Sequence, residues 1–155
     1  MFTDVAQEIE AVYRRYLHEY PRRVQDELAG VALDLRDLNF WQFPLLICMT
    51  HHSALIDHAT FASTFSSSYR DYRTRGWAGK IALDDIQVSV ATPDWASFAA
   101  RGARFAHTGE VIDGWNTTYL MRRRAEGWRC FALAPAPADG ASLSKWREWL
   151  LHLAA

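Results

Sequence analysis

The sequence has few cysteines, almost no net charge and no long apolar run, and each absence excludes a class of protein. Cys48 and Cys130 are too few for a disulfide framework and lack metal-ligand spacing, so they favour a reducing, cytoplasmic setting. Seventeen basic and eighteen acidic residues give a net charge of −1, so we expect no nucleic-acid partner. No apolar run approaches the length of a membrane span, and the first ten residues are acidic where a secretory signal would be basic. We therefore expect no membrane partner.

The chain is long enough for one domain with its own hydrophobic core. Half of its 155 residues are hydrophobic, which predicts a folded protein rather than a disordered one. We expect a single domain over residues 1–155, with a core at 1–137 and a C-terminal helix at 138–155. No bound cofactor is expected.

Aromatic residues are unusually frequent, with seven Trp, six Tyr and eight Phe. Such rings either fill a core or line a pocket for an apolar ligand. For any single ring, core packing is the more common outcome.

Helical patterns open and close the chain. Apolar residues recur at three- and four-residue steps over residues 3–20, and Pro21 is expected to end this helix because it lacks a backbone N–H. Residues 21–43 remain open: PRRVQDELAG could form a short second helix, and VALDLRDLNFW could form a helical turn or a short strand. The last helix, at 142–155, is amphipathic, and we expect it to pack on its own domain and help close a pocket.

The middle of the chain alternates between strand and helix signals. FPLLICMT and ALI predict a strand pair, and Asp57 is expected to cap a helix that ends at Gly76. Four strands should follow, from KIALDDIQVSVA, WASFAARGARFAH, WNTTYLMRRR and WRCFALAP, with turns at TPD, GEVIDG and AEG. The strand of small residues should bend near Gly102. Helices packed on one face of an antiparallel sheet make an α+β domain.

Two segments resemble the nuclear transport factor 2-like superfamily, which includes SnoaL-type polyketide cyclases, ketosteroid isomerases and limonene epoxide hydrolase. TTYLMRRRAEGWRC, at 117–130, is similar to its last two strands, and FPLLICMTHHSALIDHATFASTF is similar to its first strand pair and following helix. The resemblance covers about residues 3–137. It implies a cone-shaped, curved antiparallel sheet packed against N-terminal helices and one long helix, an apolar pocket inside the cone, and a homodimer. The C-terminal helix is an addition to this pattern.

Two reactions of the superfamily can be compared with the sequence. Ketosteroid isomerase chemistry would need a tyrosine on the first helix, which Tyr16 matches, and a carboxylate late in the first strand, where Cys48 and Met49 stand instead. It would also need a second acid deep in the sheet, whereas the remaining strand acids, Asp84 and Asp85, lie near the start of a different strand.

Epoxide hydrolase chemistry would need an Asp–Arg–Asp set. Arg101 and Arg104 are present, but their strand has no acid beyond Asp94 in the turn before it. Neither reaction is predicted.

The segment THHSALIDH, at 50–58, places three histidines and an aspartate close together. A zinc site needs three or four converging ligands, whereas neighbouring histidines on a strand point to opposite faces, and only His107 remains as an obvious further ligand. We therefore expect no metal site. One interpretation is that Asp57 caps a helix while His51, His52 and His58 lie at an exposed turn and have no chemical role. A catalytic His–Asp pair is the sharper alternative.

The predicted ligand-binding residues come from three parts of the fold. The helical side should contribute Tyr16 and Trp41, the long helix should contribute Tyr69, and one strand should present three side chains on one face by period-two alternation. The six residues are Tyr16, Trp41, Tyr69, Trp115, Thr117 and Tyr119.

Two functions are compatible with this pattern. The leading hypothesis is a SnoaL-like pocket protein that binds or transforms a small, mostly apolar molecule, with its reaction and catalytic residues unassigned. The alternative is a non-catalytic protein-interaction module, for example an immunity-type or accessory protein that uses the sheet face. A solvent-reaching cavity of several hundred Å³ would favour the first, and a cone filled by its own side chains would favour the second.

Overall fold

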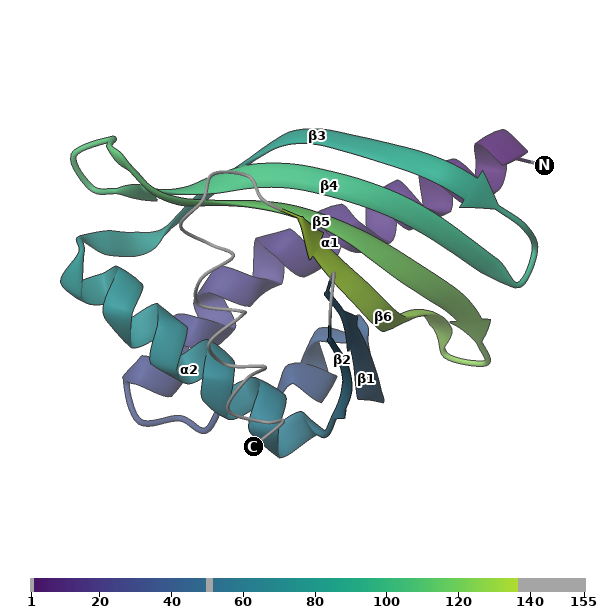
Figure 1. Ribbon diagram of the computed structural model, residues 1–155. Coiled ribbons are helices and arrows are strands. Elements are labelled where there is room, and N and C mark those ends of the chain that lie inside the picture. The colour runs from purple at the N-terminus through teal and green to yellow at the C-terminus, as the bar shows by residue number, and fades with distance from the viewer. Residues whose placement is uncertain (1, 50–51, 137–155) are drawn as a thin grey trace.

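The computed structural model describes residues 2–49 and 52–136, which form two long helices, a short 3-10 helix and six strands (Figure 1). In chain order the elements are α1 (Phe2–Leu28), η1 (Leu35–Leu38), β1 (Trp41–Cys48), β2 (Ser53–Ile56), α2 (His58–Thr74), β3 (Trp77–Ala91), β4 (Trp95–Ala106), β5 (Val111–Arg124) and β6 (Gly127–Ala136). The expected C-terminal helix lies outside the described residues. No helix within them is long and apolar enough to cross a membrane.

The strands form one six-stranded sheet in the order β2-β1-β6-β5-β4-β3. The predicted β1–β2 pair and the meander from β3 to β6 are confirmed, and the fold is α+β as expected. One neighbouring pair differs from the all-antiparallel expectation, because β1 and β6 run parallel. The reason is topological: α2 carries the chain to the far edge of the sheet, and the meander returns to place β6 beside β1.

The two helices cover one face of the curved sheet (Figure 1). α1 runs beneath the long strands, and α2 lies across one end of the concave side. The largest fully buried side chains come from both helices and several strands, which places the core between these layers. They include Tyr13, Tyr69, Phe40, Phe61, Phe98, Leu45 and Met121.

The prediction that α1 ends at Pro21 is wrong, because the helix continues to Leu28 with Pro21 inside it. Tertiary contacts explain the difference. Val24, one turn beyond the proline, is fully buried, and the Gln25 side chain donates a hydrogen bond of 2.8 Å to the Ala78 carbonyl on β3. Burial of this additional turn outweighs the local cost of a missing backbone donor.

The segment between α1 and β1, whose secondary structure the sequence left undecided, forms a turn and the short 3-10 helix η1. Gly30 adopts a positive φ of 99° just after α1, as a glycine beyond a helix end commonly does. The Asp34 side chain caps η1 by accepting from the backbone N–H of Arg36. The prediction that Trp41 lies on the helical side is wrong, because β1 begins at this residue.

The predictions for α2 are confirmed. The Asp57 side chain accepts a hydrogen bond of 2.8 Å from the Thr60 backbone N–H, and Gly76 follows the helix with a φ of 90°. Phe61, Tyr69 and Tyr72 of this helix are buried. Tyr69 and Tyr72 line the cavity described next.

Candidate functional site

A cavity of about 110 Å³ lies between the helices and the concave face of the sheet. All six tyrosines of the chain line it: Tyr13, Tyr16, Tyr20, Tyr69, Tyr72 and Tyr119. The volume is smaller than the several hundred Å³ that the pocket hypothesis anticipated. It is comparable with the roughly 150 Å³ engineered cavity that binds benzene, so it suits a ligand built on one ring.

The six residues predicted to contact a ligand all line this cavity. Thr117 and Tyr119 are buried, and their neighbour Thr118 is exposed on the opposite face of β5. The predicted period-two alternation of buried and exposed side chains therefore holds for these three residues of β5. Whether these residues contact a ligand stays a prediction.

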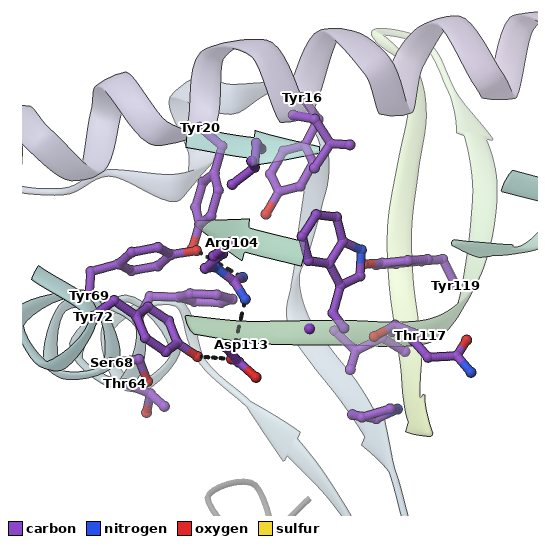
Figure 2. Close-up of a pocket in the computed structure, with 18 of the residues that line it drawn as sticks. Tyr16, Tyr20, Thr64, Ser68, Tyr69, Tyr72, Arg104, Asp113, Thr117 and Tyr119 are labelled. Atoms are coloured by element: carbon purple, nitrogen blue, oxygen red, sulfur yellow. Dashed lines mark hydrogen bonds and ion pairs between the residues drawn. The ribbon is translucent and has the colours of Figure 1, made fainter. Parts of the chain in front are cut away.

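The polar centre of the cavity is an ion pair between Arg104 on β4 and Asp113 on β5 (Figure 2). Nη1 of Arg104 lies 3.4 Å from Oδ2 of Asp113, and the two side chains are only 15% and 10% exposed. The Tyr72 hydroxyl donates a short hydrogen bond to the same carboxylate oxygen. Nη2 of Arg104 donates to the Tyr69 hydroxyl at 3.3 Å.

Strand register explains why these two charges meet. Arg104 and Asp113 are direct partners in the β4–β5 ladder, and both point toward the helices. Gly102, two residues before Arg104, pairs with Trp115. A Cβ at position 102 would come within 2.3 Å of the Trp115 ring, so the glycine makes room for the indole beside the ion pair.

Three aromatic rings surround the guanidinium of Arg104. Its Cζ lies 4.9 Å from the ring centroid of Tyr72, 5.2 Å from Trp115 and 5.5 Å from Tyr69. These distances are within the range of cation–π attraction. Burial alone lowers the pKa of Arg104, but Tyr69 and the neighbouring tyrosines raise it above its ordinary value, so Arg104 keeps its charge.

Burial raises the pKa of every tyrosine in the cavity. It raises the pKa of Tyr13 to about 12, and it raises that of Tyr16, Tyr20 and Tyr119 well above the ordinary value. The pKa of Tyr69 and Tyr72 is raised for the same first reason. The phenols therefore keep their protons at neutral pH and act as hydrogen-bond donors or acceptors, not as anions.

A second group of polar contacts lies deeper in the cone. The Trp115 indole N–H donates to the Tyr13 hydroxyl at 3.0 Å, and the Tyr13 and Tyr119 hydroxyls are 3.3 Å apart. These bonds give the hydroxyls of Tyr13 and Tyr119 hydrogen-bond partners. In contrast, the Tyr20 hydroxyl and the Trp41 indole nitrogen are buried and make no hydrogen bond of close geometry in the described part of the chain, although they lie beside the phenols of Tyr69 and Tyr16, respectively.

Arg104, Asp113 and Tyr72 were not among the predicted site residues. Asp113 was assigned to the turn GEVIDG, whereas β5 already begins at Val111. The signal was nevertheless present, since the alternation of Trp115, Thr117 and Tyr119 extends back to Asp113. This acid also revises the comparison with epoxide hydrolase, because Arg104 does have an acidic neighbour. Asp113 is, however, the one acid among the described lining residues, so an Asp–Arg–Asp set is not formed.

The histidines do not form a second site within the described chain. His52 is exposed, His107 is exposed at another turn, and His51 lies outside the described residues. Among residues 2–49 and 52–136, no group of three metal-ligating side chains comes together. The interpretation of His58 as surface decoration is wrong, because its Nε2 accepts a hydrogen bond of 3.0 Å from the buried Leu35 N–H.

A wider groove runs between α1 and β3. Its volume of about 520 Å³ exceeds that of the cavity, but it is open to solvent and lined partly by charged residues such as Arg14, Arg22 and Lys80. We favour the smaller cavity as the functional site because buried polar groups converge there.

Comparison with known proteins is consistent with this architecture. The family model described as NTF2-like protein (DUF6841) matches residues 7–138. A search of curated proteins found no match. Solved structures similar to this one include an NTF2-like protein with a cystatin-like fold from Novosphingobium aromaticivorans, with 17% identity and a TM-score of 0.58. That alignment covers 96% of this chain and 90% of the other.

Two further structures have the same fold. A ketosteroid isomerase-like protein from Erwinia carotovora atroseptica has 18% identity and a TM-score of 0.53, over 88% of this chain and 97% of that one. The Kfla4162 protein from Kribbella flavida has 17% identity and a TM-score of 0.56, over 92% and 98%. At these identities the likeness extends to the fold alone. The family model spans most of the sequence, and the chain therefore belongs to the family of NTF2-like proteins described as DUF6841.

Proposed function

We propose that this protein binds a small, mostly apolar molecule with the size of a single ring in the cavity between α1, α2 and the sheet. One observation carries the proposal: a largely buried ion pair faces an aromatic-lined space. A core made only of packed apolar side chains would not need such a pair, since taking two charges out of water is costly. The chain shares its fold with a ketosteroid isomerase-like protein, and no reaction is assigned.

A matched pair of threonines tests this proposal. Thr117 faces the cavity and Thr118 faces solvent, although both lie on β5. We expect ethylbenzene or acetophenone to shift the indole N–H signals of the cavity tryptophans in NMR spectra of the wild-type protein. Thr117→Phe should abolish these shifts because the new ring occupies the space, and Thr118→Phe should preserve them. Equal responses of the two variants, or none in the wild type, would contradict the proposal.

We also propose a setting and an assembly for the protein. Both cysteines are free, which supports a reducing, cytoplasmic location. The homodimer implied by the resemblance stays a prediction, and sedimentation equilibrium measures it directly.

A further inference from the structure

The charges inside the cavity select the kind of molecule that it can hold. Arg104 and Asp113 already neutralise one another within a largely buried space. The raised pKa of the surrounding tyrosines means that none of them supplies a further charge at neutral pH. An anionic ligand would add an uncompensated negative charge, and a cationic ligand an uncompensated positive one, in a space shielded from water.

The donors that remain open in the cavity point to the chemical group that the ligand carries. Figure 2 shows Tyr20 reaching from α1 toward Arg104, but the Tyr20 hydroxyl and the Trp41 indole nitrogen are fully covered and lie beside the phenols of Tyr69 and Tyr16. Arg104, in contrast, keeps part of its side chain exposed. Arginine has five N–H donors, of which two make the described bonds to Asp113 and Tyr69. The cavity therefore offers donors to an incoming oxygen.

The same two bonds of Arg104 are long, at 3.4 and 3.3 Å. Charge-assisted bonds to nitrogen donors are usually closer to 2.7–2.9 Å, so the guanidinium is held loosely by its own neighbours. Three aromatic rings lie around it, and the N–H groups of Arg104 that make neither of these two bonds remain to meet a ligand.

We infer that the ligand is a neutral ring compound with a carbonyl-type oxygen, that Arg104 donates to this oxygen, and that Asp113 is the residue that excludes carboxylates. This inference rests on the proposed function of the cavity. Asp113 acts by compensating Arg104: with its charge present the site is neutral overall, and without it the site carries one positive charge. Asp113 is thus a specificity-determining residue.

Three probes of similar size and different polarity separate the possibilities. Ethylbenzene has no acceptor, acetophenone has a neutral carbonyl, and benzoate carries a negative charge at pH 7. We expect the wild-type protein to bind acetophenone at least tenfold more tightly than either of the other two, as measured by titration of the tryptophan indole NMR signals. A tenfold preference corresponds to one good hydrogen bond to a charged donor.

Asp113→Asn provides the decisive change because the side chain keeps its shape and loses its charge. The unpaired Arg104 should then favour benzoate, so that the order of benzoate and acetophenone is reversed. Asp94→Asn removes a charge of the same kind from an exposed turn and should leave the wild-type order intact. If Asp113→Asn does not fold, the wild-type ranking alone decides.

Each outcome has a separate meaning. Ethylbenzene binding as tightly as acetophenone would overturn the inference and leave the proposed cavity function standing. Benzoate binding most tightly to the wild type would also overturn the inference, since the cavity would then be an anion site. Failure of all three probes to bind would overturn both the inference and the proposed function.

Discussion

The histidine-rich segment and the Arg104 cavity show opposite relations between sequence and space. His52 and His58 lie six positions apart, yet one is exposed at a turn and the other is half-buried against η1. Arg104, Asp113 and Tyr72 come from three different elements, yet their polar atoms meet. Clustering along the chain was thus a poor guide to chemistry here, whereas strand register was a good one.

The alkaline limit of stability should show the largest effect and should come from the cavity. All six tyrosines have a raised pKa in the folded protein, whereas an unfolded chain loses its phenol protons near pH 10. Stability should therefore be unaffected by the tyrosines below about pH 10 and should fall as the pH rises above it.

Absorbance near 295 nm and circular dichroism, recorded along one pH titration, measure this coupling. We expect phenolate absorbance to increase together with the loss of ellipticity, and a urea-unfolded sample to titrate near pH 10. Phenolate signals appearing near pH 10 in a folded protein would show that the tyrosines are not buried as described.

Removing the cation of the cavity should have the next largest effect. Arg104→Met leaves Asp113 buried without its ion-pair partner, which typically lowers the free energy of unfolding by about 3–5 kcal/mol. Urea denaturation measures the loss. The double variant Arg104→Met with Asp113→Asn should recover part of it, because the unpaired charge is gone. A single variant within about 1 kcal/mol of the wild type would contradict a buried, coupled pair.

Filling the space beside the ion pair should cost less. In Gly102→Ala the new Cβ would lie within 2.3 Å of the Trp115 ring and 2.5 Å of the Ala82 carbonyl oxygen. Overpacking of this kind usually costs about 1–3 kcal/mol. Thr118→Ala, on the exposed face of β5, should stay within about 0.5 kcal/mol of the wild type in the same denaturation experiment. Equal stability of both variants would mean that the sheet tolerates a side chain at position 102.

The histidine segment should show effects no larger than that of Gly102→Ala, and they should differ between its two described histidines. His58→Ala leaves the buried Leu35 N–H without its acceptor, at a typical cost of about 1–3 kcal/mol. His52→Ala changes an exposed side chain and should alter the free energy of unfolding by less than about 0.5 kcal/mol. A larger effect for His52 than for His58 would reverse the description of this segment.

Most of the fold could be predicted because its signals are local. Period-two alternation located the long strands, and Asp57 and Gly76 marked the limits of α2 through capping chemistry. The continuation of α1 through Pro21 could not be predicted in this way. It depends on burial of Val24 and on a hydrogen bond to β3, which are contacts with elements far away in the sequence.

The same distinction applies to the site. The aromatic wall was predictable, since Trp115, Thr117 and Tyr119 alternate on one strand and Tyr69 lies on a helical stripe. The ion pair was not found, because pairing Arg104 with Asp113 requires the register of two strands across a turn. The predicted strand began at Trp115, only a few residues after the true start of β5 at Val111. That small error left Asp113 in the turn and so removed the acid from the inner face of the sheet.

A crystal structure of the protein in complex with acetophenone is the most direct test of the claim that Arg104 binds a neutral carbonyl compound. We predict electron density for the ring in the cavity between α1, α2 and the sheet, with the carbonyl oxygen about 2.7–3.2 Å from a nitrogen of Arg104. The Arg104–Asp113 pair should remain in place. A cavity without acetophenone, or a ring whose oxygen points away from Arg104 toward the apolar wall, would contradict it.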